Sequence, residues 1–251
     1  MARQKGIIKL EGRVGDLSFY KNGSEYYARE KGGVDGDRIK KDPAFARTRE
    51  NGAEFGRAGK AGKVLRNALK VPISKSADKR VASRLSKQML EVIHADSTNL
   101  RGERTVVDGD LTLLDGFEFN NAIGLEAVVG TPYAVAFVRA DGECSVTISE
   151  FVPNQDIGQV DGATHFRFVL GTAVLDFENG TYEVDVAESG DLAYDAITQT
   201  NLVVETNVTA NSTLPVFVVF GVEYYQEVNG QMYLLNNKES NPLAVVVVDL
   251  P

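Results

Sequence analysis

Few residues in this sequence have the type and spacing that catalysis requires. There are two histidines, His94 and His165, and one cysteine, Cys144. The spacings typical of zinc sites, such as Cys-x-x-Cys and His-Glu-x-x-His, are absent. We expect His94 to lie at the C-terminal end of a helix and His165 to have a structural role at the start of a strand. A single cysteine in a strand is more often a core residue than a nucleophile, so we expect Cys144 to be a small core residue.

Four acidic residues are the other candidates for chemistry, namely Asp176, Glu178, Asp185 and Glu188. Paired across neighbouring strands, their carboxylates would suit a glycosidase or a calcium site. A solvated strand face is the alternative, and the lack of tryptophan weakens a sugar-binding interpretation. The Gly-x-Ser-x-Gly elbow and the Walker loop are also absent. We therefore predict no catalytic residue, no metal site and no cofactor, in a protein that is not an enzyme.

A basic segment between residues 47 and 70 is the clearest concentration of charge. Its side chains suit contact with an anion such as nucleic acid or with an acidic protein surface, although a solvated helix face would also account for them. The candidate contact residues are Arg47, Arg49, Arg57, Lys60, Lys63 and Arg66. No helix-turn-helix or RNA-recognition signature accompanies them, so we expect no readout of bases.

The same segment contains "GAEFGRAGKAGK", residues 52–63. Asp42 and Pro43 mark a helix start, and we expect this helix to end before Pro72. Each glycine within it costs about 1 kcal/mol relative to alanine. On a helical projection one side groups Phe55, Ala58, Gly59, Gly62, Leu65 and Leu69. We expect the glycines to lie in or beside the packing face, where they let another backbone approach closely.

Residues 7–31 predict a small three-stranded meander with a hairpin turn at Asn22-Gly23. Three short strands bury too little to be stable alone, so this meander must pack on the downstream β region or on another subunit. Together with the helix, it gives the predicted assembly contacts, which are Phe19, Tyr20, Gly52, Phe55, Gly56, Gly59 and Gly62.

A second helix is predicted over about 77–95, with an amphipathic stripe formed by Val81, Leu85, Met89, Val92 and Ile93. From about residue 105 short apolar runs alternate with turns. The predicted strands are 116–120, 132–139, 143–149, 164–170, 173–178, 181–187, 201–206, 214–225, 231–235 and 243–249. The fold class is thus α+β, with a small N-terminal β-meander and two basic helices followed by an all-β sandwich of jelly-roll or immunoglobulin-like type.

Charge divides the chain at the same place as this change of pattern. Residues 1–104 contain 24 Lys and Arg against 13 Asp and Glu, and residues 105–251 contain 3 against 22. The net charges are +11 and −19. We predict a basic N-terminal domain over 1–104 and an autonomous acidic β-sandwich domain over 105–251.

The N-terminal pattern resembles a protein family of Bacteroidota genomes and their mobile elements. A Gly-x-Val-Gly-Asp hairpin precedes a Phe-x-Arg-x-Arg-Glu-Asn helix, and the resemblance covers roughly residues 1–70. The matching residues are Gly12, Gly15, Asp16, Phe19, Tyr20, Phe45, Arg47, Arg49, Glu50, Asn51 and Phe55. The resemblance implies a bacterial source and carries no activity.

We predict a non-enzymatic structural protein that self-assembles through its basic N-terminal segment into a bacterial or phage-like particle or filament. Its expected partners are other copies of itself. One alternative is a nucleic-acid-associated protein that uses the basic helices, and a second is a β-sandwich that binds a carbohydrate or small ligand. No apolar run of about 18 residues and no secretory apolar stretch occur, and one cysteine fits a reducing compartment. We therefore expect a cytoplasmic protein, or part of a particle made in the cytoplasm, without membrane contact.

Overall fold

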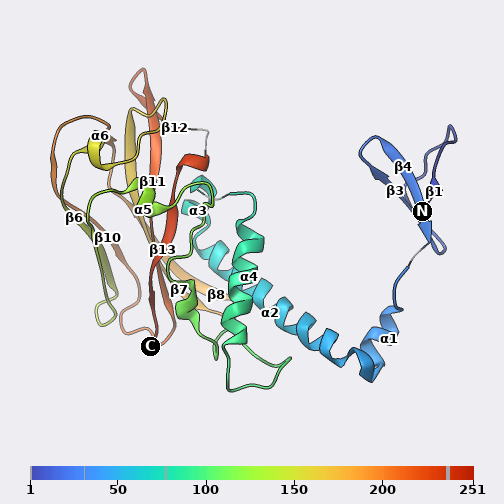
Figure 1. Cartoon of the computed structure of the whole chain (residues 1–251). Coiled ribbons are helices and arrows are strands. Elements are labelled where there is room, and N and C mark those ends of the chain that lie inside the picture. Colours follow the sequence, from blue (N-terminus) through green and yellow to red (C-terminus); the bar gives the residue numbers. More distant parts are fainter. Residues whose placement is uncertain (1, 31, 77, 236–237) are drawn as a thin grey trace. The chain divides into compact units, whose positions relative to one another are not determined.

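The computed structural model describes residues 2–30, 32–76, 78–235 and 238–251 (Figure 1). The chain forms two compact units, Met1–Glu50 and Asn51–Pro251, called unit 1 and unit 2 below. The division falls inside helix α2 (Ala46–Ala68), and the boundary predicted at 104/105 stays a prediction. The helices after residue 50 belong to the same unit as the larger sheet because they share one hydrophobic core with it.

Unit 1 contains a four-stranded antiparallel sheet. Its strand order is β1 (Ala2–Arg3), β4 (Glu25–Glu30), β3 (Leu17–Asn22) and β2 (Gly12–Val14). The predicted meander is present as β2, β3 and β4. Helix α1 (Gly36–Lys41) and the 3₁₀ turn η1 (Pro43–Phe45) follow the sheet.

The turn between β3 and β4 differs by one residue from the predicted one. Asn22 pairs with Glu25, so Gly23 and Ser24 form the two-residue loop. Gly23 has a φ of 62° and Ser24 has no positive φ. Positive φ at the first central position alone is the type II′ pattern, which glycine favours there.

Three helices open unit 2, namely the remainder of α2, α3 (Lys70–Ser76) and α4 (Val81–His94). At the start of the first helical segment, Asp42 accepts a hydrogen bond from the Ala44 amide at 2.9 Å, as the sequence predicts. The helix ends at Ala68, before Pro72 as predicted, and Pro72 is the third residue of the next helix, α3. Proline is tolerated there since the first amides of a helix have no partner within it.

Unit 2 continues as two antiparallel sheets (Figure 1). The smaller has the order β10 (Gln199–Asn207), β6 (Glu143–Phe151) and β5 (Ala134–Val138). The larger has the order β12 (Gln231–Leu234), β11 (Val216–Val228), β7 (His165–Asp176) and β8 (Thr181–Glu188). In addition, β13 (Leu243–Asp249) pairs with β11, and β9 (Leu192–Ala193) pairs with β7.

Three of the predicted strands need correction. Residues 116–120 form only an isolated bridge between Glu118 and Ala244. The strands predicted at 164–170 and 173–178 are one strand, β7, because Gly171 and Thr172 continue the pairing with β11 without a break. Short elements complete the unit: η2 (Leu111–Leu114), α5 (Leu125–Val128), α6 (Pro153–Asp156) and η3 (Lys238–Ser240).

The larger sheet is buried on both faces. Alternate residues of a strand point to opposite faces. Phe168 and Phe220 therefore lie in the core shared with the smaller sheet, whereas Leu175 and Phe217 lie in the core shared with α2 and α4. Every residue of β11 from Val216 to Tyr225 is buried. The architecture confirms an α+β fold with a sandwich of two sheets, the larger of which is covered by helices on its other face.

Candidate assembly surface

The sheet of unit 1 has no hydrophobic core. None of the described residues in 2–30 and 32–50 is buried. Phe19 and Tyr20, both half-buried, are neighbours in β3 and therefore point to opposite faces. Tyr20 stacks on Tyr27 with ring centroids 5.8 Å apart. Each face thus carries an aromatic side chain, and neither face buries any residue among those described.

The exposed apolar side chains of this sheet and its loops form a group that lacks cover. They are Ile7, Ile8, Leu10, Val14 and Leu17, with exposed fractions from 44% to 103%. Isolated exposed apolar residues are ordinary on a protein surface, and Ile7 and Ile8 differ from these because they are adjacent in sequence.

Of the four glycines of α2, Gly62 lies in the packing face as predicted, and the other three have open space beside them. The inward face consists of Glu54, Ala58, Ala61, Gly62, Leu65 and Ala68. Gly62 alone among the four glycines is buried, and a Cβ there would meet Leu85 Cγ at 3.5 Å. A Cβ at Gly52, Gly56 or Gly59 would meet nothing within 4 Å. Phe55 is 59% exposed on the same outward side. These residues are therefore not packed within the described chain, and contact with another chain stays a prediction.

The six basic candidates separate into two groups. Arg49 donates to the carbonyls of Ile39 and Asp42 at 2.7 and 2.9 Å, and Arg57 donates to the carbonyls of Arg104 and Gly102 at 2.6 and 2.5 Å. The guanidinium groups of these two arginines are therefore bound to backbone carbonyls of the same chain. The other four have no hydrogen bond or ion pair among the described residues, and they are Arg47, Lys60, Lys63 and Arg66.

Glu54 fixes a loop that sequence reasoning did not connect to α2. Its side chain is 1% exposed, and Oε1 accepts a hydrogen bond from the Gly102 amide at 2.7 Å. His94, the last residue of α4 as predicted, places Nε2 3.6 Å from Glu54 Oε2. In the sequence Glu54 looks like an exposed partner for the neighbouring basic residues, so no local signal indicates its burial.

The other residues considered for catalysis have structural environments. Cys144 is buried, and burial raises the pKa of its thiol, although hydrogen bonds with Thr172 and Thr206 act in the opposite direction. His165 Nδ1 lies 3.0 Å from Thr164 Oγ1 at the start of β7. Cys144 lies beside Thr172, in the second half of β7, whereas His165 is the first residue of β7. The cysteine and the histidine are therefore at different places along β7.

Three of the four acidic candidates have their own hydrogen-bond or ion-pair partners. Asp176 accepts bonds from the amides of Glu178 and Asn179, and Asp185 accepts one from the Asn207 amide at 2.8 Å. Glu188 pairs instead with Lys75 and Arg167. Within the described ranges, no three His, Cys, Asp or Glu residues group closely enough to hold a metal ion.

A cluster of charges joins α3 to the larger sheet, and no sequence motif indicates it. Lys75 Nζ lies 2.8 Å from Glu188 Oε1 and 2.8 Å from Glu223 Oε2, and Glu223 is 1% exposed. Burial raises the pKa of Glu188, but hydrogen bonds from Lys75 and Arg167 outweigh burial, so the pKa falls below its usual value. Arg167 also lies over the Tyr225 ring at 4.5 Å. The cluster fixes α3 against β7, β8 and β11.

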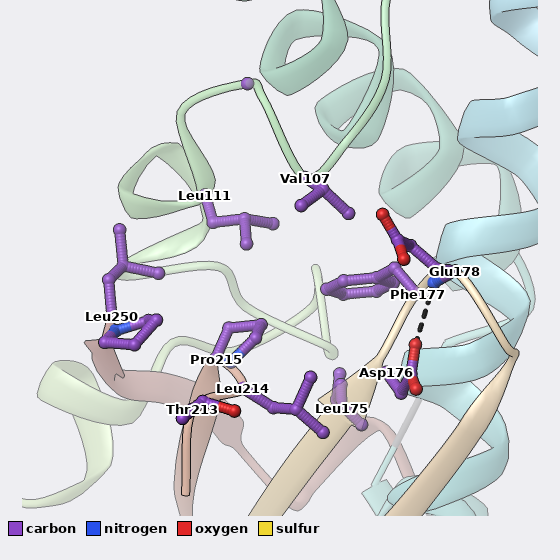
Figure 2. Close-up of a pocket in the computed structure, with 12 residues that line it drawn as sticks. Val107, Leu111, Leu175, Asp176, Phe177, Glu178, Thr213, Leu214, Pro215 and Leu250 are labelled. Atoms are coloured by element: carbon purple, nitrogen blue, oxygen red, sulfur yellow. Dashed lines mark hydrogen bonds between the residues drawn. The ribbon is translucent and has the colours of Figure 1, made fainter.

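An apolar hollow of about 380 Å³ lies near the end of β7 and is drawn in Figure 2. Its lining includes Val107, Leu111, Phe177, Leu214, Pro215 and Leu250. Figure 2 shows Asp176 and Glu178 at one side of this ring of apolar side chains. The hollow will be called the β7-end hollow.

In the part of the chain that the structure describes, no helix combines the length and apolar character needed to cross a membrane. Comparisons with protein-family models, with curated proteins and with solved structures give no match to this chain. The resemblance of residues 1–70 therefore stays a prediction.

Proposed function

We propose that this chain is a non-enzymatic structural protein that self-assembles through its N-terminal segment into a bacterial or phage-like particle or filament. The observation that carries the proposal is the sheet of unit 1, in which no described residue is buried. A small sheet needs a covered hydrophobic face for independent stability. In our proposal a second copy of the chain provides that cover.

Two further features support assembly between copies. The outward face of α2 has Gly52, Gly56 and Gly59 with open space around each, so another backbone can approach closely there. The charges of +11 on residues 1–104 and −19 on residues 105–251 favour contact between the basic part of one copy and the acidic part of the next.

Binding of nucleic acid is a second candidate, favoured by one specific observation. Three basic residues of α2 are spaced three positions apart, and none of them has an ion pair among the described residues. They are Lys60, Lys63 and Arg66. Such a row can follow a phosphate backbone without reading bases. High-salt purification followed by the ratio of absorbance at 260 and 280 nm distinguishes this candidate, because assembly by protein contacts alone leaves no nucleic acid bound.

Deletion of residues 1–50 tests the proposal. We expect the full chain to form particles of high molar mass, and residues 51–251 to be monomeric with a cooperative melting transition, because unit 2 has its own core. Light scattering at matched protein concentrations measures the molar mass. A truncated chain that assembles like the full chain would contradict the proposal. Assembly that instead disappears when Lys60, Lys63 and Arg66 become alanine, together with bound nucleic acid, would favour the second candidate.

A further inference from the structure

The loop between β1 and β2 presents two isoleucines to solvent. Ile7 is 103% exposed and Ile8 is 78% exposed. The Gln4 side chain closes the loop on Leu10: its Nε2 donates to the Leu10 carbonyl at 3.2 Å, and its Oε1 accepts from the Leu10 amide at 2.9 Å. Lys9 Nζ donates to the Gln4 carbonyl at 2.5 Å. Residues 4–10 are therefore an ordered projection with an apolar middle and basic flanks at Lys5 and Lys9.

Like the loop of residues 4–10, the β7-end hollow is mainly apolar, but its charged residues are acidic instead of basic. Most of its lining side chains are apolar (Figure 2). Two of these, Val107 and Leu250, are 51% and 40% exposed. Asp176 and Glu178 line one side. Its volume falls in the range of roughly 300–1,000 Å³ that is typical of binding sites.

We propose that the loop of residues 4–10 of one copy inserts Ile7 and Ile8 into the β7-end hollow of a second copy. This inference rests on the self-assembly proposed above and names the two surfaces that meet. The isoleucines match the apolar walls, and Lys5 offers a positive charge to the carboxylates of Asp176 and Glu178, whereas Lys9 stays bonded to the Gln4 carbonyl within the loop. The contact covers the exposed apolar loop of one copy and fills the hollow of the other.

This contact joins different surfaces of the two copies. Such a heterologous contact repeats from copy to copy and produces a ring if the rotation closes, or a filament if it does not. Apolar insertion dominates the contact, and the charge of Lys5 sets its orientation and rate of formation.

Chemical cross-linking of full-length chains tests the inference. One preparation carries Ile8→Cys and a second carries Leu250→Cys, and both positions are solvent-exposed, so folding is not at risk. The native Cys144 is buried and serves as an unreactive background. A short bismaleimide is added to the mixture. We expect a covalent heterodimer in about tenfold greater yield than from Ile8→Cys mixed with Ile197→Cys, because docking raises the local concentration of the two thiols. Ile197 is a matched control at 66% exposure.

The remaining outcomes separate this inference from the proposed function. Normal particles by light scattering, with cross-linking equal to the control, would overturn the inference and leave self-assembly standing. Monomeric protein at all concentrations would overturn both. A third chain carries both Ile8→Cys and Leu250→Cys, and cross-linking of this chain only within itself would show that the loop docks on its own copy. A small molecule retained in the hollow through purification would show a different occupant. Either result would overturn the inference.

Discussion

A fragment of residues 105–251 will not form a cooperative native state, whereas residues 51–251 will melt in a single transition. Removing α2, α3 and α4 uncovers one face of the larger sheet. That face includes Ala173, Leu175, Phe217, Val219, Leu243 and Val245. Burying a large apolar side chain stabilises a protein by about 1.5–3 kcal/mol, so the loss is on the order of 10 kcal/mol. A loss of this size is comparable with the whole stability of a typical domain, about 5–15 kcal/mol.

Thermal melting followed by near-ultraviolet circular dichroism measures this difference, since aromatic signals report fixed tertiary packing. Residues 51–251 are the matched control. A soluble 105–251 fragment with a sharp transition would support the boundary predicted from charge and would mean that the helices are dispensable for the sheet.

Lys75→Met will destabilise unit 2 by about 3 kcal/mol, because it leaves a buried carboxylate without its cation. Glu223 is 1% exposed, and its Oε2 accepts a hydrogen bond from Lys75 Nζ at 2.8 Å. Methionine keeps the length and the apolar stem of lysine, so the variant removes the charge with little change in packing. Urea unfolding of residues 51–251 gives the free energy of unfolding.

Two variants make the Lys75 prediction specific. Lys79→Met is the matched control, because Lys79 is exposed and has no ion pair among the described residues. The double variant Lys75→Met with Glu223→Gln will recover much of the loss, since the carboxylate is gone too. Equal free energies of unfolding for Lys75→Met and Lys79→Met would show that the Lys75 ion pairs do not stabilise unit 2.

The same cluster gives a pH dependence with a definite sign. The pKa of Glu188 is lower in the folded state than its usual value, so the unfolded state binds more protons as the pH falls. Stability from Glu188 is present above its unfolded pKa of about 4.3 and decreases as the pH falls through the folded pKa. In Lys75→Met this acid dependence will be weaker, because one of the two cations that lower the pKa is missing.

Local patterns in the sequence predicted much of this fold. The apolar run from Val216 to Tyr225 is long enough to identify a strand buried on both faces, and the stripe of α4 identifies its inward side. The turn between β11 and β12 is formed by Asn229-Gly230, a pair that favours tight hairpin turns, and both residues have positive φ, 53° and 75°. Each of these signals depends on neighbouring residues only.

Features that depend on distant residues could not be predicted. The charge step at 104/105 indicated a domain boundary, but the apolar side chains of α2 and α4 determine that these helices belong to unit 2. The inward face of α2 follows from its contacts with α4 and with the loop at 102–104, and Gly52, Gly56 and Gly59 lie outside that face. The contact of Lys75 with Glu223 joins residues far apart in the chain, so no spacing rule could indicate it.

Amide hydrogen exchange of the full chain at two protein concentrations tests the central claim most directly. If another copy covers the sheet of unit 1, amides of β3 and β4 between Leu17 and Glu30 will exchange slowly in the assembled state and much faster after dilution. Amides of β11 from Val216 to Tyr225 are the internal reference, because their protection arises within one chain. We predict protection in β3 and β4 that depends on concentration, beside constant protection in β11. Protection of β3 and β4 that is the same at every concentration would contradict assembly through unit 1.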